Sequence, residues 1–91
     1  MARVLITLKI MPKNLKVDLS KLEEEVFKKI EEFGGNIGKS NQEDVAFGLK
    51  AVIISFFSDE TKSNLDPLEE SIQKMKNVES VSIIEVRRAL G

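Results

Sequence analysis

Apolar residues along this 91-residue chain change their spacing in an order that allows few folds. Residues 4–11 alternate between apolar side chains on one face and a more mixed set on the other, which predicts a strand that Pro12 ends. Residues 19–33 instead carry apolar side chains three or four positions apart, which predicts a helix with one apolar stripe. The stripe consists of Leu19, Leu22, Val26, Ile30 and Phe33.

The remaining residues predict two adjacent strands, a second helix and a last strand. Residues 37–44 are polar and favour an edge strand, whereas residues 47–58 carry apolar side chains on both faces and favour a central strand. Residues 64–75 again show a helical stripe. Residues 78–86 predict the last strand, in which Ile83-Ile84 breaks the alternation and indicates either a bulge or a stretch covered on both faces.

The helix ends carry their own signals. Either Asp18 or Ser20 is expected to cap the first helix, because residues 20–23 fit a capping box, and Gly34-Gly35 is expected to end it. Pro67 is tolerated in the first turn of the second helix, where the amides have no intrahelical partner. Asn77 is expected to close that helix in a left-handed conformation.

The order strand, helix, strand, strand, helix, strand predicts an α+β, ferredoxin-like split fold. Two right-handed crossovers then give a four-stranded antiparallel sheet with both helices on one face, and the other face is left to solvent or to a partner. A chain of this length is expected to form one domain, residues 1–91.

Composition argues against several classes of function. The chain has no His, Cys, Tyr or Trp, so the usual general base, the thiolate nucleophile and the commonest metal ligand are absent. Its 14 Lys and Arg nearly balance 15 Asp and Glu, which leaves little net field for nucleic acid or an anionic membrane. No apolar run is long enough to span a bilayer. We expect a cytoplasmic protein that is not an enzyme and needs no cofactor or metal.

A Phe-Gly pair at the start of the central strand is the most unusual local feature. Phe47 is a large apolar residue where turns are usually polar, Gly48 marks a bulge or a close approach of another backbone, and Asp44 precedes them. Two interpretations are equally open. The segment is either a tight turn whose Phe folds onto the core or a surface that another molecule contacts.

A basic pair, Arg87-Arg88, lies near the end of the last strand. It is either a contact site on a short tail or part of a frayed, solvated terminus. Other charged groups are weaker candidates: Lys9, Lys13 and Lys16 are most simply scattered surface lysines, and the glutamates of the first helix a solvated face. Gly38-Lys39-Ser40 lacks the spacing and the helix that a phosphate loop requires.

Four segments together resemble the archaeal elongation factor 1-beta family, over the whole chain. They are Met11-Pro12 with Val17-Asp18-Leu19 and Leu22, residues 43–51 (EDVAFGLKA), Asn64-Leu65-Asp66 with Leu68, and residues 78–81 running on to Arg87-Arg88-Ala89. The second and fourth segments are the specific ones. The resemblance implies that a lone exchange domain is the complete protein, corresponding to the C-terminal domain of longer eukaryotic relatives.

The resemblance also implies a function. The chain would promote exchange of GDP for GTP on elongation factor 1-alpha in its GDP-bound form, without direct contact with nucleic acid or membrane. A basic side chain near the C-terminus would act at the partner's magnesium position; Arg88 is the nearest match, and Arg87 could share the task. Phe47 and Gly48 match the turn that presses on the partner. Eukaryotic members usually carry Lys where this chain has Arg88, and Arg is a planar fork rather than a compact ammonium.

A different class of function stays open alongside this one. A ferredoxin-like domain can also be a small-molecule-sensing or RNA-binding module, self-associating through its open sheet face. Phe57 is the expected aromatic on that face, with no second aromatic at the matching place in the first strand.

Overall fold

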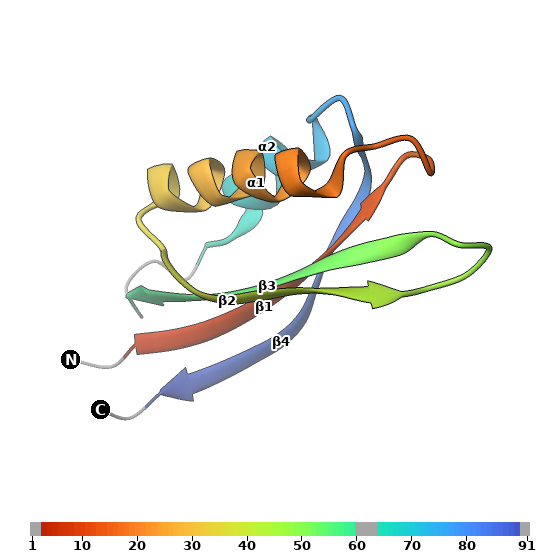
Figure 1. The fold of residues 1–91 in the computed structure, drawn as a ribbon. Helices are drawn as coiled ribbons and strands as arrows, with labels where there is room; N and C mark the ends of the chain where they lie inside the picture. The colour runs from red at the N-terminus through yellow and green to blue at the C-terminus, as the bar shows by residue number, and fades with distance from the viewer. Residues whose placement is uncertain (1–2, 60–63, 90–91) are drawn as a thin grey trace.

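The computed structural model describes residues 3–59 and 64–89, which form the predicted series of strands and helices. The elements are β1 (Arg3–Pro12), α1 (Leu19–Phe33), β2 (Asn36–Asp44), β3 (Lys50–Asp59), α2 (Asp66–Gln73) and β4 (Val78–Ala89). The strands make one antiparallel sheet in the order β2-β3-β1-β4. Both helices cover the same face of this sheet (Figure 1). The α+β, ferredoxin-like prediction is therefore confirmed.

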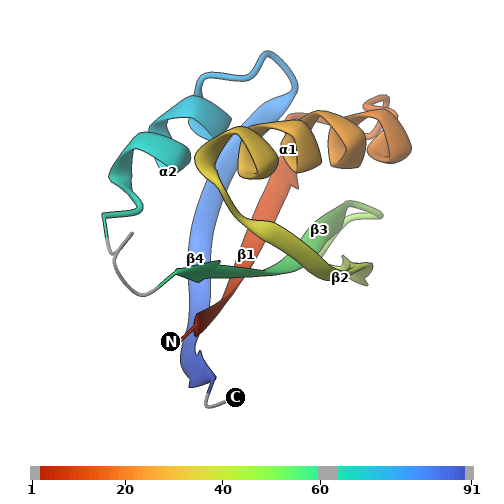
Figure 2. The same ribbon diagram turned by 90° about the vertical axis from the view of Figure 1, so that its left-hand side faces the viewer.

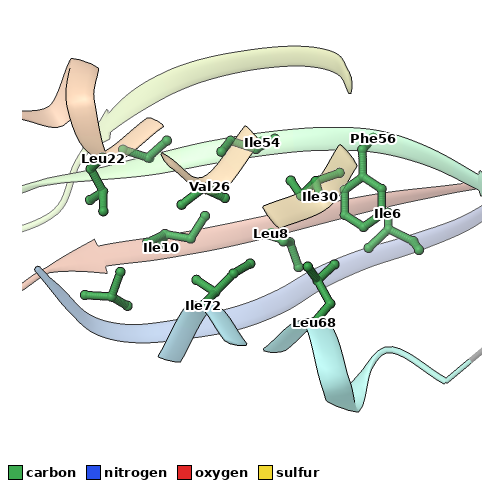
Figure 3. Packing of buried hydrophobic residues seen from close by; sticks show 12 residues of the cluster. Ile6, Leu8, Ile10, Leu22, Val26, Ile30, Ile54, Phe56, Leu68 and Ile72 are labelled. Carbon is green, nitrogen blue, oxygen red and sulfur yellow. The ribbon is translucent and has the colours of Figure 1, made fainter. Parts of the chain in front are cut away.

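The core lies between the two helices and the covered face of the sheet (Figure 3). The predicted stripe of α1 contributes three fully buried residues, Leu22, Val26 and Ile30, and α2 contributes Leu68 and Ile72. They pack on the central strands β1 and β3, which contribute Ile6, Leu8, Ile10, Val52, Ile54 and Phe56. Burial of each large side chain stabilises the fold by about 1.5–3 kcal/mol, so this layer makes a firm scaffold for the exposed loops.

The start of α1 follows one of the two predicted caps. The side chain of Asp18 accepts hydrogen bonds from the amides of Ser20 at 3.0 Å and Lys21 at 3.3 Å, so Asp18 is the N-cap. Ser20 lies inside the helix, and the capping box that would begin there is wrong. At the other end Gly34 has φ 102°, the left-handed conformation expected of a glycine that ends a helix.

The end of α2 differs from the prediction at Asn77. The C-cap of α2 is Lys74, with φ −79°. Among the described residues, Phe47 is the only non-glycine residue with positive φ, so Asn77 does not adopt the left-handed conformation. A series of turn hydrogen bonds closes the helix instead, from Met75 N–H to the Ile72 carbonyl and from Val78 N–H to the Met75 carbonyl. The carbonyl of Asn77 accepts the amide of Lys13 at 3.0 Å, which ties this loop to the end of β1.

The limits of β3 and β4 also differ from the predicted ones. The central strand β3 begins at Lys50 rather than at residue 47, because Phe47 and Gly48 both have positive φ and so leave the β region. The last strand β4 runs to Ala89, beyond the predicted residue 86, because it pairs along β1 as far as Arg3. The bulge predicted at Ile83-Ile84 is confirmed, since the pairing with β1 skips Ile84.

Neither helix of the described residues covers the second face of the sheet (Figure 2). Its residues include Leu5 and Phe57, which face each other across β1 and β3 and are half-buried. The guanidinium of Arg3 lies 4.8 Å from the centre of the Phe57 ring, so one side of that ring is already occupied. No helix among residues 3–59 and 64–89 is long and apolar enough to cross a membrane.

Candidate partner-docking site

The turn between β2 and β3 projects from one end of the sheet (Figure 1). Two backbone hydrogen bonds of 2.9 Å close it, from Leu49 N–H to the Ala46 carbonyl and from Val45 N–H to the Leu49 carbonyl. The two residues between Ala46 and Leu49 have positive φ, 53° at Phe47 and 79° at Gly48. Positive φ at both central residues is the requirement of a type I′ turn, which suits the twist of a β-hairpin.

Phe47 is an unusual occupant of this turn. The first central position of a type I′ turn is normally Asn, Asp or Gly, and a bulky residue there is held in a conformation that costs roughly 1–2 kcal/mol. Its side chain is also 94% exposed, so no packing within the chain offsets that cost. Of the two interpretations made from the sequence, the one in which Phe47 folds onto the core is wrong. A strained and exposed aromatic side chain is a reason to look for function at this position.

Gly48 is required by its conformation rather than by lack of room. A Cβ atom there would lie 3.6 Å from Cδ2 of Leu15, an ordinary van der Waals distance, but φ of +79° disfavours any L side chain. Asp44 is the last residue of β2 and pairs with Lys50 at the start of β3. It therefore lies at the base of the turn, exposed, and not at its tip.

Leu15 is a neighbour of this turn that the sequence analysis missed. It lies in the loop between β1 and α1, and its side chain is 67% exposed. An open groove of about 470 Å³ is lined by Asn14, Leu15, Lys16, Phe47 and Leu49, and so joins the loop to the turn. The available signal was a single large apolar residue within the polar run Lys13-Asn14-Leu15-Lys16.

Arg87 and Arg88 belong to β4 and are paired with β1, opposite Leu5 and Val4 respectively. The expectation of a frayed terminus is therefore wrong for these two residues. Successive side chains of a strand point to opposite faces, so Arg87 lies on the open face and Arg88 on the side of Val4 and the helices. Arg87 forms an ion pair with Glu85, with 3.0 Å between Nε and Oε2, and its side chain remains 71% exposed. Arg88 is also exposed, and Figure 2 shows the end of β4 running away from both helices.

The structure does not bring the turn and the arginines together. β1 is antiparallel to β3 and β4, so Lys50 lies near its C-terminal end and Arg88 near its N-terminal end. Residues 4–12 of β1 separate them by about 26 Å, at roughly 3.3 Å per residue of strand. The longest extent of the Cα trace is 42 Å. A partner that contacts both must therefore cover much of the length of the sheet.

Other candidates gain nothing from the structure. Gly38-Lys39-Ser40 lies within β2, where the pairing with β3 skips Gly38, and the chain runs from there into β3 rather than into a helix that could aim amides at a phosphate. The described residues include no group of three or more acidic side chains that could hold a metal ion. The glutamates at positions 24, 25, 31 and 32 of α1 are exposed, in keeping with a solvated face.

Comparison with solved structures supports the fold alone. The ACT domain from GTP pyrophosphokinase of Chlorobium tepidum matches with a TM-score of 0.61 at 18% identity, covering 88% of this chain and 96% of that chain. A de novo designed protein, Foldit4, matches with a TM-score of 0.60, also at 18% identity, covering 98% of both chains. Identities this low carry no functional argument.

Comparison with protein sequences is far more specific. Elongation factor 1-beta of Staphylothermus marinus is 40% identical over 87 residues, covering 94% of this chain and 92% of the relative. Elongation factor 1-beta of Methanosarcina acetivorans is 33% identical over 88 residues, covering 97% and 99%. That of Methanothermobacter thermautotrophicus is 31% identical over 90 residues, covering 99% and 100%. The family described as the EF-1 guanine nucleotide exchange domain matches residues 5–89. The chain therefore belongs to the elongation factor 1-beta family, whose members are nucleotide exchange factors rather than enzymes.

Proposed function

We propose that this chain, acting as a single exchange domain, binds elongation factor 1-alpha in its GDP-bound form and promotes replacement of GDP by GTP. The observation that carries the proposal is the family match over residues 5–89, which includes the strained, exposed Phe47 and both arginines. Translation elongation would place the chain in the cytoplasm. The open sheet face gives no comparable support to RNA binding, because Arg3 already lies over the Phe57 ring on which a base would stack.

In the proposed mechanism, this chain weakens the contacts that hold the phosphates of GDP in the partner. A GTPase holds GDP through backbone amides, a lysine and a magnesium ion that neutralises the phosphates. A guanidinium brought to the magnesium position competes with the ion for the same negative charge. Arg88 is the proposed competitor, and Arg87 is available as well, because its exposed ion pair with Glu85 is worth at most about 1 kcal/mol.

The turn supplies the second contact in this proposal. Phe47 needs no rearrangement to enter an apolar recess on the partner, since its side chain already projects from a turn closed by two hydrogen bonds. Binding energy gained at this end would then hold the arginine end against the nucleotide site. The two ends lie far apart, so the paired strands between them set the distance between the two contacts.

The required effect is moderate in energy. Weakening GDP from nanomolar to micromolar affinity takes about 4 kcal/mol of coupling between exchange factor and nucleotide. The coupling is reciprocal, so GDP must weaken the binding of the exchange factor by the same amount. GTP then fills the vacated site. No covalent bond is made or broken, in keeping with a chain that has no His or Cys.

Release of a fluorescent GDP from elongation factor 1-alpha, followed by stopped flow, tests the proposal. We expect micromolar amounts of this chain to accelerate release, and an unchanged rate would reject the function.

Arg88→Ala should lower the maximal release rate more than the affinity for the partner, whereas Phe47→Ala should reduce both. Arg87→Ala and the charge-conserving Arg88→Lys identify which cation acts and whether its planar shape matters. Lys28→Ala, at an exposed position of α1, is the control. Unchanged exchange in the Arg88 or Phe47 variant would remove that residue from the site.

A further inference from the structure

The loop at residues 13–17 lies beside the Phe47 turn and carries its own exposed apolar side chain. We propose that this loop is the second arm of one docking surface, in which Leu15 and Phe47 enter the same apolar recess of the partner and Lys16 meets a carboxylate at its rim. The inference rests on the proposed function and deepens it by naming the chemistry of the partner's surface. Both side chains line one open groove of about 470 Å³.

The loop is held in place by hydrogen bonds at each end. The amide of Lys13 donates to the Asn77 carbonyl at 3.0 Å, the amide of Lys16 donates to Oδ1 of Asn14 at 2.9 Å, and Asp18 caps α1 directly afterwards. Leu15 therefore projects from a fixed backbone and not from a loose one. A side chain fixed in advance loses less conformational entropy when a partner binds, which favours its use as an anchor.

The pairing of two exposed apolar side chains is itself informative. Single apolar residues on a protein surface are ordinary, but Leu15 and Phe47 border the same groove, with the half-buried Leu49 beside them. The two segments are also close enough that a Cβ at Gly48 would touch Leu15. The exposed apolar surface is therefore continuous across two loops, and a recess that receives only Phe47 would leave Leu15 in water.

Charge around the groove points to the kind of partner surface that fits it. Lys16 is the charged residue among the lining residues, and a smaller hollow of about 80 Å³ beside it has Lys50 as its charged residue, with Gly48 and Leu15 in the same lining. Glu43 and Asp44 line neither hollow. A recess with apolar walls and an acidic rim is the complement of this arrangement, because opposite charges at the rim steer and orient two surfaces.

Variants at Leu15 test the apolar half of the proposal. We expect Leu15→Ala to raise the concentration of this chain that gives half-maximal GDP release by about tenfold, with the maximal rate unchanged. Leu15→Met keeps the volume and should stay within about twofold of the original chain. The thermal unfolding midpoint should not change in either variant, because Leu15 is mostly exposed. Affinity for GDP-bound elongation factor 1-alpha is measured separately by titration calorimetry, and the same ratio is expected.

Charge reversal tests the acidic rim. Lys16→Glu should raise the concentration of this chain that gives half-maximal GDP release. Added salt should lower that concentration for the variant, whereas it should raise it for the original chain. Lys28→Glu makes the same change in net charge at an exposed position of α1 and should have little effect. Equal effects of the two reversals, or a Leu15→Ala variant that matches the original chain while Phe47→Ala is impaired, would overturn the inference. If the original chain binds with the expected dependence on Leu15 but does not accelerate release, the exchange function fails and the docking surface stands.

Discussion

At the scale of single residues, the β2–β3 turn shows most clearly a backbone conformation that lowers stability. Gly48 has the conformational freedom that its φ of 79° needs, but Phe47 beside it has φ of 53° and no such freedom. At a position that is both strained and exposed, a small polar residue is expected to give a more stable fold than a large apolar one. A stabilising substitution at Phe47 is therefore expected to exist and to be harmful to exchange.

Phe47→Asn tests this directly, because Asn tolerates the left-handed region and suits a type I′ turn. We expect the free energy of unfolding to rise by about 1 kcal/mol, which corresponds to a melting temperature higher by roughly 4–8 °C in a domain of this size. Exchange activity should fall to the level of Phe47→Ala. The alanine variant is the matched control, since it also lacks the ring but keeps the conformational cost. Equal stability of the Asn and Ala variants would contradict the assigned strain.

The unusual character of Phe47 was visible in the sequence, because a large apolar residue beside Gly between polar strand ends is rare. The exposure of its side chain could not be predicted, because the same sequence was equally consistent with a Phe47 buried against the core. The local pattern marked Leu15 only as one large apolar residue in a polar run, which does not reveal its contact with the turn. Its role depends on a contact with a turn that lies distant in the chain, and only the packing of β1 beside β3 brings the two loops together.

At the scale of elements, the junction between α1 and β2 shows two glycines with different tasks. Gly34 ends the helix in a left-handed conformation, as its position predicts. Gly35 is buried, and a Cβ atom there would lie 2.7 Å from Cδ2 of Phe56 and 2.8 Å from Cγ2 of Ile30. The second glycine therefore lets the start of β2 pass close to the core, a requirement of packing that no helix-ending rule includes.

Substitutions at the two glycines should separate these tasks. We expect Gly35→Ala to lower the free energy of unfolding by about 2 kcal/mol, because an extra carbon in a filled core forces its neighbours apart. Gly34→Ala should cost about 1 kcal/mol for its backbone conformation, and Gly34→Asn less than that. Urea denaturation monitored by circular dichroism gives the three values. A Gly35→Ala variant as stable as the original chain would show that Phe56 and Ile30 move aside without penalty.

The helix and strand types followed from periodicity, and helix ends could be predicted only where a local signal marked them, with Asp18 and Ser20 both open at the start of α1. Asp18 and Gly34 are signals that act through their own backbone neighbours, and both function as helix ends in the structure. Asn77 carries a weaker signal, and a tertiary hydrogen bond from the amide of Lys13 fixes its carbonyl in another arrangement. Tertiary contacts of this kind override local preference and cannot be read from a segment alone.

On the scale of the whole molecule, the proposed site is divided between two ends of one sheet. The turn and the 13–17 loop lie at one end, and the arginines of β4 lie at the other, with the core of β1 and β3 between them. The order of helices and strands along the chain, with the crossover rules, was enough to predict an antiparallel sheet with both helices on one face. The separation of the two ends followed only from the pairing register, which places Arg88 opposite Val4 and Val52 opposite Ile10.

Separated ends should act independently on the partner. We expect the free-energy effects of Leu15→Ala and Arg88→Ala on the second-order rate constant for GDP release to add in the double variant, to within about 0.5 kcal/mol. Stopped-flow release with the single and double variants completes the cycle. A coupling energy well above that value would mean that one end changes how the other contacts the partner. The pair Leu15→Ala and Phe47→Ala serves as the comparison, because neighbours in one groove should not be additive.

The extra residue in β4 decides which way each arginine points. Before Ile84, Val81 and Ile83 are opposite Ile10 and Leu8 on the helix side; after it, Val86 and Arg88 are opposite Ile6 and Val4 on that same side. An unbroken alternation from Val81 would have exchanged the directions of Arg87 and Arg88. Loss or gain of one residue between the bulge and the arginines would thus rotate both guanidinium groups by half a turn about the strand axis. The length of this segment, as well as the identity of its residues, therefore decides which arginine lies on each face of the sheet.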